Sequence, residues 1–149
     1  MEIKPYSHYK EDEILPLYRA VGWSNYYERP EMLRRGYENS LCIFGAYEDE
    51  KLIGIIRAVG DGYSVVLIQD ILVKPEYQRK GIGTALMREI LRHYSHVYQI
   101  QLATDKTEKT MAFYRSLGFQ PVGEIGCCGF MKCGPCGGSK PPPYKAGDL

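Results

Sequence analysis

A short glycine-containing segment has the composition of an anion-binding turn. Residues 78–84 read Gln-Arg-Lys-Gly-Ile-Gly-Thr and join a long apolar run to an amphipathic, helix-like stretch. Gly81 and Gly83 let the main chain come close to a ligand because they have no Cβ. The first N–H groups of a helix have no partner inside it, and the helix dipole adds partial positive charge there. With Arg79 and Lys80 adding charge at the same place, the segment predicts a site for an anion the size of a diphosphate.

The same residues also suit a plain turn from a strand into a helix, with two solvated cations. A lone Gly-x-Gly does not separate these two interpretations. The third glycine of the dinucleotide-binding fingerprint is absent, and no Lys-Ser/Thr pair of a P-loop follows. Neither of those two nucleotide-binding motifs is therefore predicted.

Several other side chains have types that suit acid–base catalysis or the binding of a cation. Asp70 stands in an apolar run, where a buried carboxylate needs a partner. That partner is either a cationic ligand, for which Asp70 would be base or anchor, or a structural ion pair. Tyr114 can donate a proton from its phenol or stack in the core. Trp23, Tyr26 and Tyr27 either line a pocket for a cation through cation–π contacts or cover the core.

The cysteines give a competing signal. Cys42 lies alone in an apolar run, while Cys127, Cys128, Cys133 and Cys136 crowd together near the C-terminus. The last two are spaced as in a thioredoxin-type redox pair, and four thiolates are enough to hold zinc. A glycine- and proline-rich stretch follows them where a redox pair would have a helix. We therefore expect no metal and interpret the cluster as incidental.

Apolar residues alternate between helical and strand periods, which predicts a mixed α/β fold on a single sheet. Residues 64–73 form the most continuous apolar run and are expected as a central strand. Residues 21–27 are expected as an aromatic loop. Strands are expected at 3–6, 41–47, 52–59, 64–73, 98–103, 119–122 and 127–131, and helices at 10–20, 30–39, 81–94 and from a cap at Asp105 or Thr107 to Leu117.

Charge and composition exclude several classes of protein. The formal net charge is +1, so no nucleic acid or anionic membrane partner is expected. No apolar run approaches the roughly 20 residues of a membrane helix, and the N-terminus lacks a secretory apolar stretch. We expect a cytoplasmic protein with one domain over residues 1–132. Residues 133–149 are expected to be a flexible Gly/Pro/Lys tail.

Two blocks of the sequence resemble the GNAT superfamily of N-acetyltransferases. Residues 73–86 resemble the family's acetyl-CoA-binding motif, whose signature Gln/Arg-x-x-Gly-x-Gly/Ala is matched at 78–83. Residues 107–119 are similar to the family's later helix and strand, which ends Phe-Tyr-x-x-x-Gly-Phe. The resemblance covers residues 1–132. It implies a GNAT-like acyl-CoA N-acyltransferase fold, with the central sheet splayed between its fourth and fifth strands.

The resemblance also implies a role for each part of the site. The turn would hold the pyrophosphate of acetyl-CoA, and the strand before it would pair with pantetheine. A main-chain N–H near Leu72 would face the thioester oxygen, and Tyr114 would protonate the leaving thiolate. Thr107 stands where the family often has an asparagine that touches pantetheine, and it can cap the helix instead. The cofactor-binding residues are expected to be Ile71, Leu72, Val73, Gln78, Arg79, Lys80, Gly81, Ile82, Gly83, Thr84, Thr107 and Tyr114.

The implied activity is transfer of an acetyl group from acetyl-CoA to a primary amine of a small molecule, by direct attack in a ternary complex. The segments at 21–23 and 39–40 resemble small single-domain members such as the plastid-type serotonin N-acetyltransferases. The acceptor is therefore expected to be arylalkylamine-like or polyamine-like. A protein or peptide N-acetyltransferase and a catalytically weak acetyl-CoA sensor are the alternatives. Whether the protein forms a homodimer is open.

Overall fold

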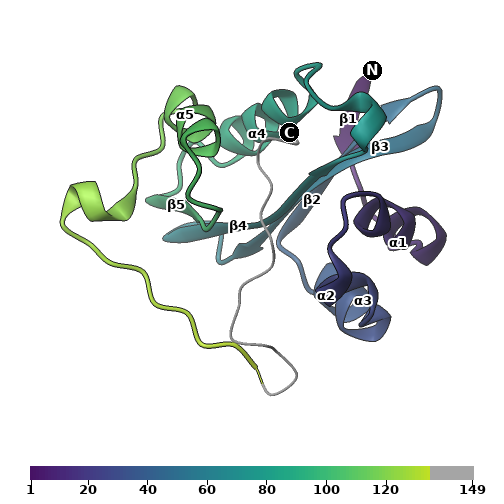
Figure 1. Cartoon of the computed structure of the whole chain (residues 1–149), viewed down its shortest axis with the longest axis horizontal. Helices are drawn as coiled ribbons and strands as arrows, with labels where there is room; N and C mark the ends of the chain where they lie inside the picture. Colours follow the sequence, from purple (N-terminus) through teal and green to yellow (C-terminus); the bar gives the residue numbers. More distant parts are fainter. Residues whose placement is uncertain (135–149) are drawn as a thin grey trace. The chain divides into compact units, whose positions relative to one another are not determined.

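The computed structural model describes residues 1–134, which form two compact units, residues 1–103 and the residues from Thr104 on. The first unit contains a five-stranded mixed sheet in the order β1-β2-β3-β4-β5 (Figure 1). Strands β1, β2, β3 and β4 each pair antiparallel with the next, and β5 runs parallel to β4. The strands are β1 (Glu2–Pro5), β2 (Cys42–Glu48), β3 (Lys51–Gly60), β4 (Val65–Val73) and β5 (Gln99–Leu102).

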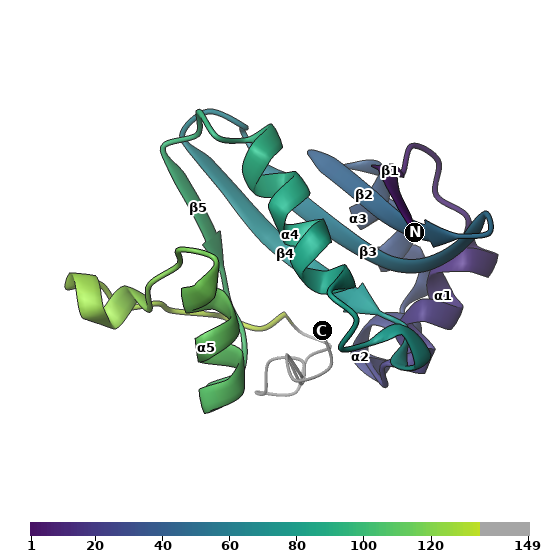
Figure 2. The same cartoon turned by 90° about the horizontal axis from the view of Figure 1, so that it is seen from above.

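One long helix, α4 (Ile82–His93), covers one face of this sheet (Figure 2). Its apolar side chains recur at helical spacing, and Leu86 and Ile90 are fully buried against the strands. Gly54 in β3 allows this close contact. A Cβ at Gly54 would lie 3.0 Å from the Leu72 carbonyl oxygen and 3.4 Å from Leu86 Cδ1. The first turns of α4 are therefore held close to β3.

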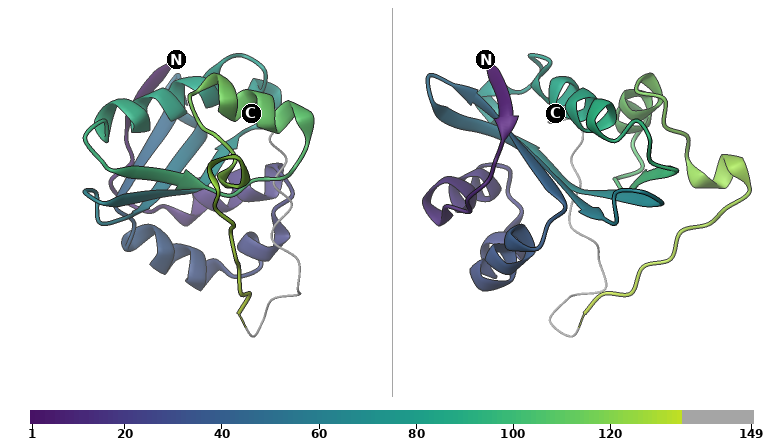
Figure 3. Two further views of the ribbon diagram at one scale, coloured as in Figure 1. Left: turned by 90° about the vertical axis from the view of Figure 1, so that its left-hand side faces the viewer. Right: turned by 180° about the vertical axis from the view of Figure 1, so that it is seen from behind.

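Three helices lie on the opposite face: α1 (Glu11–Ala20), α2 (Ser24–Tyr27) and α3 (Pro30–Glu38) (Figure 3). Pro30 begins α3 because the first helical position needs no N–H partner. The strands and helices predicted between residues 3 and 117 are all present, with ends shifted by a few residues. The prediction of an aromatic loop at 21–27 is wrong in part, since its second half forms the single helical turn α2.

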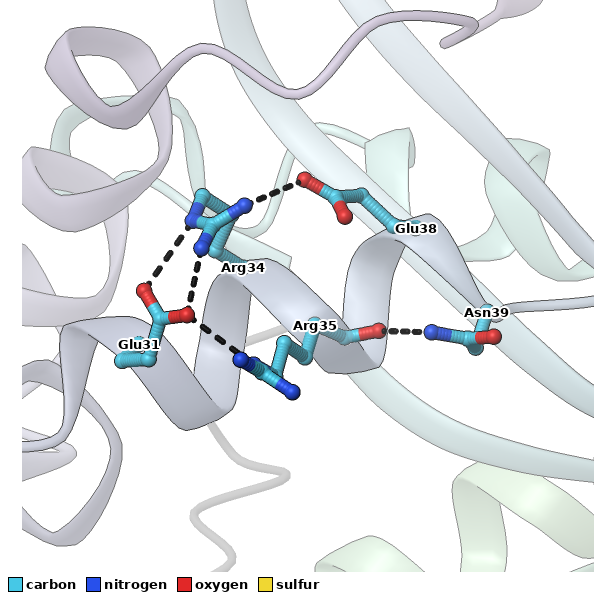
Figure 4. Close-up of polar contacts among 5 residues, drawn as sticks. All are labelled: Glu31, Arg34, Arg35, Glu38 and Asn39. Carbon is cyan, nitrogen blue, oxygen red and sulfur yellow. Dashed lines mark hydrogen bonds and ion pairs between the residues drawn. The ribbon is translucent and has the colours of Figure 1, made fainter.

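The exposed side of α3 carries a network of ion pairs (Figure 4). Glu31 pairs with both Arg34 and Arg35, and Arg34 also donates to Glu38 at 2.9 Å. Asn39 Nδ2 donates to the Arg35 carbonyl oxygen at 2.8 Å at the end of the helix. Exposed pairs at this spacing each contribute only about 0.3–0.5 kcal/mol. They support the helix without linking it to the core.

Gly60 ends β3 in a conformation that only glycine adopts easily. Its φ is 133°, and an added Cβ would lie 2.4 Å from the Val65 carbonyl oxygen. We expect Gly60→Ala to lower the free energy of unfolding by about 3 kcal/mol, from backbone strain and the clash together. Gly22 is the matched control, because its φ is 77° but no atom lies within 4 Å of a Cβ there. Gly22→Ala should cost only about 1 kcal/mol, and equal losses in urea titrations of the two variants would contradict the clash.

The second unit consists of α5 (Glu108–Ser116) and a 3₁₀ turn at Val122–Ile125. The predicted cap is confirmed, because Thr107 Oγ1 accepts the Thr110 N–H at 3.2 Å. Gly118 follows the helix in the left-handed region, with φ 91°. The strands predicted at 119–122 and 127–131 are wrong. Pro121 and the left-handed Gly126 (φ 80°) bracket the 3₁₀ turn, and residues 127–134 are exposed with no neighbouring strand among the described residues.

Candidate active site

The carboxyl-terminal half of β4 has one open edge. The parallel pairing with β5 runs from Val65 opposite Gln99 to Ile68 opposite Leu102. Beyond Ile68, within residues 1–134, β4 pairs only with β3, and Figure 2 shows β4 and β5 diverging. The sheet is therefore splayed between its fourth and fifth strands, as the resemblance implied.

The register with β3 decides which main-chain groups this edge presents. Lys74 N–H donates to the Ile53 carbonyl oxygen at 2.9 Å, which continues the β3–β4 ladder. Alternate residues of an antiparallel strand point their main-chain groups in opposite directions. The groups of Leu72, which lies opposite Ile55, therefore belong to the ladder, while those of Ile71 and Val73 face the open edge.

One of these edge groups already has a partner. Gln78 Nε2 donates to the Val73 carbonyl oxygen at 2.9 Å. The other three edge groups have no hydrogen-bond partner within residues 1–134. They are the Ile71 N–H, the Ile71 carbonyl and the Val73 N–H. A main-chain N–H near Leu72 was predicted to face the thioester oxygen. The N–H of Leu72 itself lies in the ladder, so of the neighbouring groups the Ile71 N–H is the one at the open edge, and its role toward a thioester stays a prediction.

The turn after β4 presents a second group of main-chain donors. Arg79 and Gly81 have positive φ of 62° and 81°, and they turn the chain sharply into α4. The first bond of the helix runs from Ala85 N–H to the Gly81 carbonyl oxygen at 3.0 Å. The N–H groups at positions 82, 83 and 84 find no acceptor among the described residues.

The residues just before these donors are exposed, and two of them are positively charged. Gly81, Arg79 and Lys80 are exposed, and no atom lies within 4 Å of where a Cβ of Gly81 would be. The Lys80 ammonium lies 5.5 Å from the centre of the Tyr77 ring. Unpaired donors at a helix start, next to two cations, suit the linked phosphates of a nucleotide cofactor.

Asp70 is buried in an ion pair. Asp70 is 1% exposed, and its Oδ2 accepts hydrogen bonds from Arg57 Nε at 2.6 Å and from the Tyr18 hydroxyl at 2.8 Å. Burial raises the pKa of the Tyr18 phenol well above its usual value, and the Asp70 charge raises it further. Tyr18 therefore stays a donor. Of the two alternatives for Asp70, the contacts are those of the structural ion pair.

The aromatic residues of the 21–27 segment pack mostly into the core. Trp23 and Tyr26 are 5% and 8% exposed. Their ring centres lie 6.1 and 5.4 Å from that of Tyr18. Tyr27 is half-buried, with the Arg19 guanidinium 5.8 Å from its ring centre. Of the two alternatives, the burial of Trp23 and Tyr26 fits residues that cover the hydrophobic core.

Two polar residues near this site were not predicted. Gln69 lies half-buried beside Asp70, and its Nε2 donates to the Tyr26 hydroxyl at 3.1 Å. Arg57 is 7% exposed and is the partner of Asp70. The sequence does contain a signal for Arg57, because it is the one charged residue in the apolar run 52–59.

The two remaining predicted residues belong to the second unit. Tyr114 is 8% exposed. The centre of its ring lies 5.0 Å from that of Phe113 and 6.0 Å from that of Phe119. Thr107 Oγ1 bonds both the N–H and the hydroxyl of Thr110, so this side chain is used in capping. That these residues join the turn and the strand around one cofactor stays a prediction.

The structure contains no group of three or more possible metal-ligating side chains within residues 1–134. Cys127, Cys128 and Cys133 are exposed free thiols, and Cys136 lies outside the described residues. None of the helices in the described chain has the length and apolar character needed to cross a bilayer.

Comparison with known proteins places these features in a family. The sequence model of the acetyltransferase (GNAT) domain matches residues 39–121. A solved GNAT family acetyltransferase from Streptococcus pneumoniae TIGR4 is 43% identical, with a TM-score of 0.81 over 90% of this chain and 98% of that chain. An uncharacterized ycf52-like N-acetyltransferase of Prochlorococcus marinus is 31% identical over 72% of this chain and 61% of its own length.

The fold is shared more widely than the sequence. The PaiA N-acetyltransferase of Thermoplasma acidophilum, solved in complex with coenzyme A, is 20% identical with a TM-score of 0.63 over 80% of this chain and 91% of that chain. The chain spans 28% to 61% of the length of the first curated relatives it matches. The family match, the splayed sheet and the turn before α4 agree, and the chain belongs to the GNAT acetyltransferase family.

Proposed function

We propose that this chain is an acetyl-CoA-dependent N-acetyltransferase. The observation that carries the proposal is the run of unpaired N–H groups at the start of α4, directly after the open edge of β4. The first feature suits a pyrophosphate and the second suits an amide-containing arm that pairs as a strand does. CoA has both parts, in that order along the molecule.

The open edge gives each part of the arm a partner. The Val73 N–H and the Ile71 carbonyl are the groups that bind the amides of pantetheine. The Ile71 N–H then lies nearest the thioester, where it stabilises the negative charge that develops on the carbonyl oxygen. The amine nitrogen attacks the thioester carbon, the carbon–sulfur bond breaks and the thiolate of CoA leaves.

The remaining step is the return of a proton to sulfur. Tyr114 is the proposed acid, because a phenol is able to protonate a thiolate late in the collapse of the intermediate. Asp70 is not assigned as the base, since the residue is only 1% exposed and its Oδ2 is already bonded to Arg57 and Tyr18, which leaves an amine no access to that oxygen. The amine loses its proton to water or to a group not identified by the contacts above.

The acceptor is proposed to be a primary amine of a small molecule, arylalkylamine-like or polyamine-like, that reacts in a ternary complex in the cytoplasm. Gln69, which adjoins the open half of β4, and its hydrogen-bond partner Tyr26 are the side chains proposed to meet it. A peptide amine is the second candidate. A panel of both kinds of amine, assayed for free CoA, decides between them, and turnover of peptides alone would overturn the small-molecule proposal.

Binding of CoA is tested most sharply at Gly81. Asparagine and aspartate both tolerate its left-handed conformation and have nearly the same shape, and nothing lies within 4 Å to clash. Gly81→Asp adds a negative charge beside the proposed phosphates, whereas Gly81→Asn does not. We expect the dissociation constant for CoA, measured by calorimetry, to rise about tenfold more for Gly81→Asp than for Gly81→Asn. Equal affinities in the two variants, or no binding by the unmodified protein, would contradict the proposed site.

A further inference from the structure

The β3–β4 ladder contains one extra residue on β4. Arg57 lies opposite Asp70, but the next residue of β3, Ala58, lies opposite Ile68. Gln69 is therefore unpaired and forms a β-bulge, which bends the strand and re-aims the side chains around it. Both Gln69 and Asp70 make their contacts with the helices of one face, to Tyr26 and Tyr18.

The bulge determines which main-chain groups face the open edge. Without the extra residue, continuing the pairing from Ala58 opposite Ile68 would place Ile71, not Leu72, opposite Ile55. The groups of Ile71 would then enter the ladder, and those of Leu72 would point outward. A shift of one residue therefore removes the proposed contacts of Ile71 and Val73 with the cofactor arm.

The apolar side chains of this stretch do not select between the two registers. Ile71, Leu72 and Val73 are all apolar and all buried, so exchanging their faces leaves the apolar pattern unchanged. Asp70 does select, because a shift would place it opposite Ile56, on the sheet face covered by α4. A carboxylate without a partner is strongly disfavoured there.

The observed register gives Asp70 two donors and Arg57 several partners. Arg57 Nε and the Tyr18 hydroxyl both bond to Asp70 Oδ2. Arg57 Nη1 donates to Ser40 Oγ at 3.3 Å, and its guanidinium lies 5.3 Å from the centre of the Tyr37 ring. Asp70 is therefore held from β3 and α1, and its partner Arg57 is held in turn by Ser40 and by Tyr37 of α3.

We propose that the buried Arg57–Asp70 pair is a register lock that holds the extra residue in β4 and so presents the main chain of Ile71 and Val73 to the pantetheine arm of CoA. This rests on the proposed function, since it assigns a partner to that edge. Arg57 and Asp70 are positioning residues, because they act through the strand and touch neither reactant. The pair should therefore affect the binding of ligands that carry the pantetheine arm and not of ligands that carry the phosphates alone.

The test compares two ligands in a variant without the pair. Arg57→Met/Asp70→Leu removes both charges together, so neither is left buried alone, and Tyr18 keeps its 2.9 Å hydrogen bond with Tyr37. CoA and 3′-phosphoadenosine 5′-diphosphate share the phosphates, but only CoA has the arm. We expect the preference for CoA to fall about tenfold, from the loss of two main-chain hydrogen bonds, while the nucleotide binds as before. The control Arg34→Gln/Glu38→Gln removes an exposed pair from α3 and should leave the preference unchanged.

Amide hydrogen exchange reads the register directly. In the unmodified protein the Leu72 amide should be protected and the Ile71 amide should exchange quickly, and in the double variant this order should reverse. Arg57→Lys, which keeps the charge but not the geometry of the guanidinium, is the second variant if the first does not fold, and it should show a smaller change in the same direction. An unchanged preference and unchanged exchange in a folded variant would overturn the lock. Failure of the unmodified protein to bind CoA would instead overturn the proposed function, and the exchange experiment would still decide the register.

Discussion

Replacing Asp70 or Arg57 singly is expected to lower the free energy of unfolding by about 3–5 kcal/mol, because each change leaves the other charge buried without its partner. The side chains of the pair are only 8% and 0% exposed, so water cannot replace the missing ion. For a chain of this length, such a loss lowers the melting temperature by about 10 °C. Thermal unfolding of Asp70→Asn and Arg57→Met, followed by circular dichroism, measures it.

The double variant Arg57→Met/Asp70→Leu is the control for this expectation. With both charges removed, its stability should lie close to that of the unmodified protein, because the cost of burying the two ions disappears together with their attraction. If the two single losses simply added up in the double variant, the residues would not act as a pair. A single variant as stable as the unmodified protein would contradict the burial of the charge.

Replacing Tyr114 by phenylalanine is expected to lower kcat about 100-fold, because the thiolate of CoA then leaves without a positioned acid. The dissociation constant for CoA should stay the same, since the ring and its packing against Phe119 are retained. The assay follows release of free CoA with an amine that the panel has shown to be acetylated. Tyr98→Phe is the matched control, because it removes a hydroxyl from a tyrosine that is 82% exposed.

Three outcomes of this experiment support different functions of Tyr114 and of the protein. A large loss of kcat with unchanged affinity supports Tyr114 as the acid. An unchanged kcat would transfer the protonation to water or to another group. If no amine of either kind is acetylated by the unmodified protein, the chain is a binding protein for acetyl-CoA rather than an enzyme.

The sequence predicted most of the elements because their signals are local. The glycine-containing turn, the amphipathic pattern of α4 and the capping threonine at 107 each depend on residues a few positions apart. The strands predicted at 119–122 and 127–131 depended on a ladder partner elsewhere, which a local pattern does not report. A run of apolar residues therefore does not by itself show that a strand forms.

The details of the site were less predictable for a similar reason. Which alternate residues of β4 face the open edge depends on pairing with β3 and on the bulge at Gln69. Neither feature is visible in a run where Ile, Leu and Val follow one another. The two alternatives for Asp70 depend on Arg57, which is distant in sequence but lies opposite it in the sheet.

The open edge of β4 has a consequence for how members of this family diverge. The groups proposed to hold the cofactor are peptide N–H and C=O groups, which every amino acid except proline carries in full. Genetic drift at these positions is therefore expected to alter side chains while leaving cofactor affinity nearly intact. A family member that loses only its proton donor would still bind acetyl-CoA but would no longer catalyse transfer efficiently. Its cofactor-binding motif would be unchanged, so the motif alone would not reveal the loss.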